Sequence, residues 1–228
     1  MKGIFVSGTG TGVGKTFVTR AIAAALHATG KRVAALKPIE TGCVDGVARD
    51  SVMLARAAGR PELADFKGFY RSELPLAPYA AALETNTPPP VVRSLVDAIH
   101  LAARGSELAL VEGAGGLFVP IDARETTADL VAALGLPVLL VAPNALGVLS
   151  VALSTAECAR ARGIELRAVV LIDPTPAQQD PSIRTNARIL DERLGTPVFE
   201  FPQTEDSDEA LAIAATTSGL LAAVLDAR

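Results

Sequence analysis

Close to its first residue the chain reads Gly8-Thr9-Gly10-Thr11-Gly12-Val13-Gly14-Lys15-Thr16. A short apolar run, Gly3–Gly8, leads into this glycine-rich loop, and a helical pattern over Lys15–Thr29 follows it. Glycines let backbone N–H groups turn inward around oxygen anions, and the helix N-terminus adds its partial positive charge at the same point. The loop therefore predicts a cradle for phosphate groups.

The end of the loop indicates a nucleoside triphosphate with magnesium. Lys15 would reach the β and γ phosphates, and the Thr16 hydroxyl would ligate the Mg²⁺ that bridges them. A Gly-x-Gly-x-x-Gly pattern hidden in the loop could suggest a dinucleotide fold. The Lys-Thr pair, and the lack of an acidic residue at the end of the second strand, argue against it. The expected nucleotide contacts here are Gly12, Val13, Gly14, Lys15, Thr16 and Phe17.

Apolar runs alternate with helical segments along the chain. Strands are expected at Gly3–Gly8, Arg32–Pro38, Leu108–Glu112, Pro137–Ala142, Leu166–Asp173 and Pro197–Phe201. Helices are expected at Lys15–Thr29, Asp50–Ala58, Val91–Arg104, Thr126–Leu134, Gly147–Arg162, Pro181–Leu194 and Ser207–Asp226. Because the strands are apolar nearly throughout, we predict an α/β, doubly wound, mainly parallel sheet with helices on both faces, as in P-loop NTPases. No linker interrupts residues 1–228, so a single domain is expected.

Composition excludes several classes of partner. The net charge of −4 and the pI near 5.3, with scattered Lys and Arg, predict no nucleic-acid partner. Cys43 and Cys158 form no CxxC pattern. The uncharged stretch Leu130–Ala156 is broken by glycines and prolines, which favours a buried core over a membrane span. With no signal-peptide pattern at the N-terminus, we expect a cytoplasmic protein that binds small molecules.

Two carboxylates are candidate partners for the metal. Mg²⁺ prefers hard oxygen ligands and keeps several waters, so Thr16, Asp50 and Glu112 are a sufficient protein contribution. Glu112 closes an apolar strand, where a carboxylate suits a ligand at the edge of the sheet better than it suits the core. Asp50 fits equally well as a helix N-cap, and the two roles are compatible.

Three motifs carry a resemblance to a known family. Five residues separate Gly8 from Gly14, so the loop is one residue longer than the common phosphate-binding form. The second strand ends in Lys37-Pro38-Ile39-Glu40-Thr41-Gly42, and the next core strand runs into Val111-Glu112-Gly113-Ala114-Gly115-Gly116. With Arg49-Asp50-Ser51 at the place of a metal-binding Asp, the chain resembles the dethiobiotin synthetase family over most of its length.

The resemblance implies an ATP-driven ring closure. 7,8-Diaminopelargonate takes up CO2 as a carbamate, a carbamate oxygen attacks the γ-phosphate of ATP, and the second amine closes the urea ring with release of ADP and phosphate. Lys15 and Lys37 would supply catalytic charge beside Mg²⁺, although a solvated strand-end lysine is the ordinary interpretation of Lys37. The implied substrate contacts are Thr11, Lys37, Thr41 and Ser150.

Ser150 belongs to a helix start, Gly147–Ser150, that the family brings to the neighbouring subunit's substrate, so a homodimer is expected. Such an uncapped helix N-terminus suits a carboxylate. The nucleotide contacts implied beyond the loop are Asp50, Glu112, Gly113, Ala114, Gly115, Asp173, Pro174, Pro202, Gln203 and Thr204.

Two positions depart from the family pattern. Gly12 stands where some members have an acidic residue, so any charge from there is absent. Asp173 stands where the family places an Asn that reads adenine, and an ionised Asp can only accept hydrogen bonds. We expect ATP to be used, with weaker discrimination against CTP. Alternatively, Asp173 merely ends its strand before Pro174.

Other nucleotide-dependent proteins compete with this interpretation. A related amidoligase acting on a corrinoid precursor shares this kind of loop, but the chain is short and has no glutaminase domain. A partition ATPase would carry an additional early lysine in the loop, where this chain has Gly10. A small-molecule kinase is disfavoured because no Arg-rich lid is evident.

Overall fold

The computed structural model describes residues 1–173 and 180–225, so Pro174 and the predicted helix end at Asp226 lie outside the described residues. Six strands form one sheet in the order β2-β5-β1-β6-β7-β8, and every neighbouring pair is parallel. The strands are β1 (Gly3–Gly8), β2 (Val33–Leu36), β5 (Leu108–Gly116), β6 (Val138–Pro143), β7 (Leu166–Ile172) and β8 (Val198–Phe201). The predicted parallel α/β sheet is confirmed.

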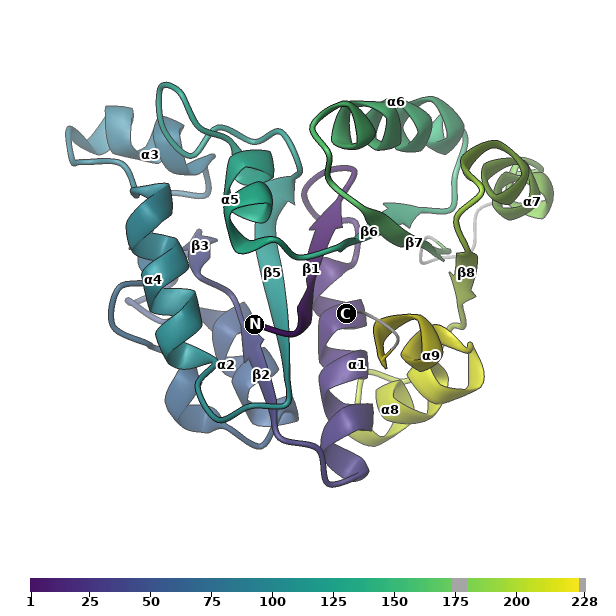
Figure 1. Cartoon of the computed structure of the whole chain (residues 1–228), viewed down its shortest axis with the longest axis horizontal. Helices are drawn as coiled ribbons and strands as arrows, with labels where there is room; N and C mark the ends of the chain where they lie inside the picture. The colour runs from purple at the N-terminus through teal and green to yellow at the C-terminus, as the bar shows by residue number, and fades with distance from the viewer. Residues whose placement is uncertain (174–179, 226–228) are drawn as a thin grey trace.

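Helices cover both faces of this sheet (Figure 1). One face packs against α1 (Lys15–Ala28), α2 (Arg49–Ala57), α8 (Asp208–Thr217) and α9 (Leu220–Leu225). The other packs against α4 (Val92–Ala102), α5 (Thr127–Leu134), α6 (Val148–Ala161) and α7 (Ile183–Leu194). In β1, Ile4 and Val6 join the first core and Phe5 joins the second. Because alternate strand residues point to opposite faces and both faces are covered, apolar residues are favoured along the whole strand rather than at every second position.

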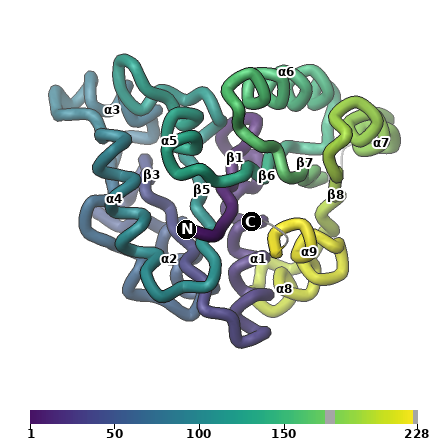
Figure 2. Tube along the Cα trace, viewed as in Figure 1, coloured from purple at the N-terminus to yellow at the C-terminus, as the bar shows by residue number. Residues whose placement is uncertain are grey.

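A second, two-stranded sheet lies beside the first and was not predicted. It consists of β3 (Ile39–Thr41) and β4 (Tyr70–Ser72), which pair in parallel. The chain between them forms α2 and the 3-10 helix η1 (Pro61–Leu63), and α3 (Pro78–Thr85), labelled in Figure 2, follows them. Strands of three residues are too short to show as an apolar run. Thr41, one of the implied substrate contacts, is the last residue of β3.

Two predicted boundaries are wrong. The helix expected over Ser207–Asp226 is interrupted at Gly219, whose φ of +78° is left-handed, so that α8 and α9 are separate. The strand expected to end at Glu112 continues to Gly116 with a register shift against β1. The uncharged stretch around β6 divides into the end of α5, a strand and the start of α6, as expected. Within the described residues, no helix has the length and apolarity that a membrane crossing needs.

Strand register brings the candidate site together. Leu36 pairs with Val111, and Val6 pairs with Glu112. Lys37, which follows Leu36, and Glu112 therefore emerge at the same carboxyl edge of the sheet, next to the loop that follows β1. In open parallel sheets this edge is where ligands bind.

Candidate active site

The glycine-rich loop leads into α1 with an open helix start. Gly14 is the N-cap at φ 94°, no side chain caps the helix, and its first turn contains no acidic residue. A Cβ added to Gly14 would lie 2.3 Å from Ile172 Cδ1, so only glycine fits between the loop and β7. The first N–H groups of α1 are thus left for an anion, as the motif predicts.

Lys15 is folded back onto its own loop. Its Nζ donates to the carbonyl oxygen of Gly10 at 2.7 Å, and the residue is buried. The pKa of the Lys15 ammonium is lowered to about 8, mainly because the group is buried; Glu112 and Asp50 act to raise this pKa and Lys37 acts to lower it. A phosphate group placed in the loop would restore the charge of Lys15 by replacing the carbonyl as its partner.

Glu112 and Lys37 form the buried centre of the site. Glu112 is fully buried, and its Oε1 accepts from Thr16 Oγ1 at 2.7 Å and from Lys37 Nζ at 2.8 Å. The Lys37 ammonium also pairs with Asp50. Burial on its own would lower the pKa of Lys37, but Glu112 and Asp50 outweigh it and raise that pKa. Lys37 is therefore a fixed positive charge, and the solvated strand-end interpretation is wrong.

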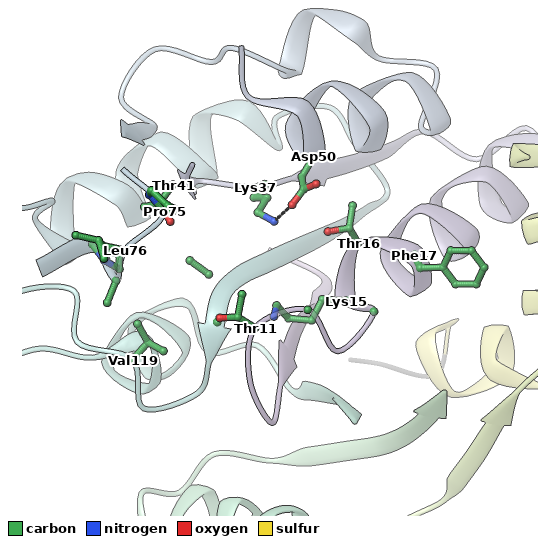
Figure 3. Close-up of a pocket in the computed structure, with 16 residues that line it drawn as sticks. Thr11, Lys15, Thr16, Phe17, Lys37, Thr41, Asp50, Pro75, Leu76 and Val119 are labelled. Carbon is green, nitrogen blue, oxygen red and sulfur yellow. Dashed lines mark hydrogen bonds and ion pairs between the residues drawn. The ribbon is translucent and has the colours of Figure 1, made fainter. Parts of the chain in front are cut away.

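Asp50 lies in the first turn of α2 but does not cap that helix. The N-cap is Ala48, which makes no side-chain capping bond, and the helix begins at Arg49. The Asp50 carboxylate instead points toward Lys37 (Figure 3). The alternative interpretation of Asp50 as a helix N-cap is wrong.

The donor set suits a divalent cation with few protein ligands. Glu112 Oε2 is buried and has no hydrogen-bond partner in the described part of the chain. Leaving a buried carboxylate oxygen unpaired is costly unless a cation or water meets it. Over the same residues no group of three or more His, Cys, Asp or Glu side chains gathers as a metal site. The Thr16 hydroxyl with two carboxylates fits Mg²⁺, which retains several waters.

A cleft of about 490 Å³ opens above this centre. Its lining includes most of the predicted loop and edge residues, namely Thr11, Gly12, Gly14, Lys15, Thr16, Phe17, Lys37, Thr41, Asp50, Ala114 and Gly115. An apolar wall that sequence reasoning missed also lines the cleft, made of Pro75, Leu76, Ala77, Pro78 and Val119. Pro75 and Leu76 of this wall lie across the cleft from Thr16 and Phe17 (Figure 3). A nucleoside triphosphate and a partly apolar small molecule could therefore bind side by side in one cleft.

Comparison with known proteins agrees with this geometry. A family described as an AAA domain matches residues 2–210. An ATP-dependent dethiobiotin synthetase of Anaeromyxobacter dehalogenans (strain 2CP-C) is 43% identical over 187 residues, which are 82% of this chain and 83% of the relative. One of Saccharopolyspora erythraea is 41% identical over 87% of this chain and 86% of its own length. The chain belongs to the ATP-dependent dethiobiotin synthetase family.

The fold is shared more widely than the family. Chloroplast FtsY of Physcomitrella patens superposes with a TM-score of 0.51 at 16% identity, and the match covers 93% of this chain and 64% of FtsY. At that identity the likeness concerns the fold alone.

The candidate base-binding residues lie along the carboxyl ends of β7 and β8. Asp173 follows β7, and its Oδ1 accepts from Asn144 Nδ2 at 2.9 Å. Asn144 is fully buried, and its own Oδ1 accepts from Asn186 Nδ2 at 2.9 Å. Asp173 thus accepts a hydrogen bond from Asn144, whose orientation is held by Asn186. Pro202, Gln203 and Thr204 follow β8 and are not among the residues that line the cleft.

Four further predicted positions lie at the borders of the site. Ser150 is exposed in the first turn of α6, whose N-cap Gly147 makes no side-chain capping bond, as predicted, and it is not part of the cleft lining. Val13 packs against the core on the α1 face. A Cβ on Gly113 would lie 2.9 Å from the ring of Phe5, so this glycine serves packing beneath the site. Phe17 points away from Lys37 and packs edge-on against Phe201.

Sequence reasoning missed a buried group behind Asp50. Glu40 is 6% exposed and contacts the start of α2, where Ser51 is also reached by Arg71. Glu40 stands inside the motif that carries the family resemblance, between apolar Ile39 and the glycine turn. A carboxylate in that apolar setting is the signal that would have found it.

Proposed function

We propose that this chain is an ATP-dependent dethiobiotin synthetase, which joins 7,8-diaminopelargonate and CO2 into a cyclic urea as ATP is split to ADP and phosphate. The observation that carries the proposal is one cleft that holds the phosphate loop on one side and Lys37 with an apolar wall on the other. The relatives at 41–43% identity, named for this activity, support it.

The reaction needs positioning and charge rather than an enzyme nucleophile. A carbamate forms on one amine, and one of its oxygens attacks the γ-phosphorus while the bond to the β-phosphate oxygen breaks. The second amine then attacks the carbamoyl carbon, closes the ring and expels phosphate. Lys15 is proposed to contact the β and γ phosphates, and Lys37 is proposed to contact the carbamate and the transferring phosphoryl group. Such charge in a dry site is the main source of rate enhancement in phosphoryl transfer.

Thr16, Asp50 and Glu112 are the residues proposed to hold Mg²⁺. When bound, the ion would neutralise charge on the phosphate oxygens. The unpaired Oε2 of Glu112 supports this assignment. Binding of the ion would also let Lys37 shift from the carboxylates toward the substrate.

The diamine is proposed to lie between the loop and the apolar wall. Thr11 and Thr41 offer hydroxyl groups at the two sides of the cleft, and Pro75, Leu76 and Val119 offer apolar surface for a hydrocarbon chain. Ser150 would receive the substrate carboxylate of a neighbouring subunit, so the proposal includes a homodimer. A cytoplasmic location likewise stays a prediction.

The adenine base is proposed to lie near Asp173 and the segment Pro202–Thr204. The backbone around Gly113, Ala114 and Gly115 would border the nucleotide, since Gly116 lies so close to the loop that a Cβ there would be 3.2 Å from the carbonyl oxygen of Gly8.

Growth of a bacterial strain that lacks its own dethiobiotin synthetase tests the proposal. Expression of this chain should restore growth on diaminopelargonate without biotin, and expression of Lys15→Ala should not. If the wild-type chain is made in folded form and the strain still grows only with dethiobiotin or biotin, the proposal is wrong.

A further inference from the structure

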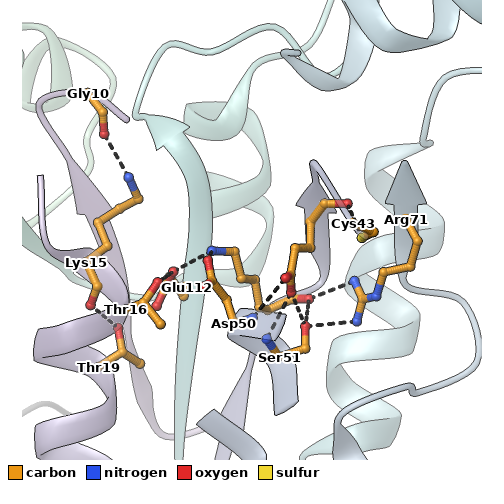
Figure 4. Close-up of polar contacts among 11 residues, drawn as sticks. Gly10, Lys15, Thr16, Thr19, Cys43, Asp50, Ser51, Arg71 and Glu112 are labelled. Carbon is orange, nitrogen blue, oxygen red and sulfur yellow. Dashed lines mark hydrogen bonds and ion pairs between the residues drawn. The ribbon is translucent and has the colours of Figure 1, made fainter. Parts of the chain in front are cut away.

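The buried carboxylate of Glu40, in β3, accepts three hydrogen bonds from the start of α2. Glu40 Oε1 accepts from the backbone N–H of Asp50 at 2.9 Å. Its Oε2 accepts from the backbone N–H of Ser51 at 2.9 Å and from Ser51 Oγ at 2.7 Å. Figure 4 shows these bonds converging beside Asp50 and Ser51. The carboxylate therefore replaces the capping side chain that Ala48 does not provide.

Arg71, on the neighbouring strand, contacts the same helix start. It is the register partner of Glu40 in the β3–β4 pair, where opposite charges stabilise each other. Its Nη2 donates to Ser51 Oγ at 3.1 Å, and its Nη1 donates to the carbonyl oxygen of Lys37 at 3.0 Å. Arg71 thus joins the start of α2 to the end of β2.

The two residues held in this way, Asp50 and Lys37, pair with each other at the candidate metal site. Glu40 accepts a hydrogen bond from the backbone N–H of Asp50, and Arg71 donates one to the backbone carbonyl of Lys37. The Asp50 side chain is 36% exposed, and among the described residues its carboxylate is bonded to Lys37 alone. Its position against Glu112 and Thr16 consequently depends on where its backbone is fixed.

We propose that Glu40 is a positioning residue: its buried carboxylate, which accepts from the start of α2, fixes the backbone of Asp50 so that the Asp50 carboxylate faces the magnesium site. The inference rests on the proposed function, because it takes Asp50 as a contributor to that site. Partners behind metal ligands act by setting ligand orientation, and their loss weakens metal binding without removing a ligand.

Manganese binding provides a readout that does not depend on turnover. The free Mn²⁺ signal in electron paramagnetic resonance is followed during titration of the protein in the presence of ADP. Glu40→Gln keeps the size of the side chain but removes its charge and one acceptor, and we expect its Mn²⁺ affinity to fall by roughly tenfold or more. Unfolding temperatures, measured by circular dichroism, show that each variant is folded during the titration.

Two further variants separate a structural role from a positioning role. Glu107→Gln removes a carboxylate that accepts the backbone N–H of Arg32 at 3.0 Å at the opposite end of the sheet, and it should leave Mn²⁺ affinity unchanged. Asp50→Asn removes the proposed ligand and should weaken binding at least as much as Glu40→Gln. Should Glu40→Gln fail to fold, Ser51→Ala removes one of the three bonds to Glu40, and a smaller loss in the same direction is expected.

The outcomes distinguish the inference from the proposal beneath it. If Asp50→Asn weakens Mn²⁺ binding and folded Glu40→Gln, or Ser51→Ala in its place, does not, the positioning role is refuted while the metal assignment stands. If Asp50→Asn itself binds Mn²⁺ as the wild type does, Asp50 is not part of the metal site and both fall. A loss in Glu40→Gln that equals the loss in Glu107→Gln would mean a general structural effect, which also overturns the inference.

Discussion

Replacing Lys37 with Met should show how much the Lys37 ammonium contributes to the stability of the folded protein. The variant keeps an unbranched apolar stem but leaves Asp50 and the fully buried Glu112 without their shared cation. Breaking a buried pair by removing one partner costs about 3–5 kcal/mol, and the exposure of Asp50 favours the lower end. For a protein of this size that corresponds to an unfolding temperature roughly 6–12 °C below that of the wild type.

Magnesium should reverse most of this loss, because the ion would supply the missing positive charge. We therefore expect Mg²⁺ to raise the unfolding temperature of Lys37→Met more than that of the wild type. Thermal unfolding followed by circular dichroism, with EDTA and with Mg²⁺, measures both effects. Lys31→Met serves as a control, since Lys31 pairs with exposed Glu107 at 3.8 Å and such surface pairs contribute little. A Lys37→Met protein as stable as the wild type in EDTA would refute the reasoning.

Three further outcomes are expected. Lys15→Ala and Glu112→Gln should stay folded by circular dichroism but close the ring at least roughly tenfold more slowly in steady-state assays, since each loses charge-assisted contacts; wild-type rates would contradict this. The pKa of Lys15 without ligand is about 8 and bound phosphate should raise it, so ADP binding should take up a proton above pH 8. The affinity for ADP should therefore be constant below that pH and fall above it. Calorimetry in buffers of different ionisation enthalpy measures this uptake, and its absence would exclude Lys15 as the phosphate partner. Asp173→Asn should raise the ratio of kcat/KM for ATP to that for CTP, and an unchanged ratio would remove Asp173 from the base site.

The parts of the site that sequence reasoning predicted are those set by local signals. The phosphate loop needs only a strand, glycines and Lys15-Thr16 in order. Glu112 could be placed because it is a charged residue in an apolar strand, and parallel strands end at one edge of a sheet. For Lys37 the family resemblance was needed as well, because a solvated lysine is the ordinary interpretation of a charged strand end. The observed register brings Lys37 and Glu112 within 2.8 Å of each other.

The parts that escaped prediction depend on contacts between distant short segments. Glu40 and Arg71 meet only because two three-residue strands pair, and strands of that length leave no periodic pattern in the sequence. The apolar wall around Pro75 and Leu76 is likewise a turn whose position is set by its neighbours. The division of α8 from α9 was signalled by Gly219, but the apolar periodicity on both sides concealed it.

The central claim is that the cleft couples ATP cleavage to ring closure. The purified protein is incubated with 7,8-diaminopelargonate, [¹³C]bicarbonate, Mg²⁺ and ATP, and both ADP and the product mass are followed over time. We expect dethiobiotin that carries one ¹³C atom, formed in step with one ADP and absent without the diamine. ADP release that does not depend on the diamine, with no ring-closed product, would contradict it.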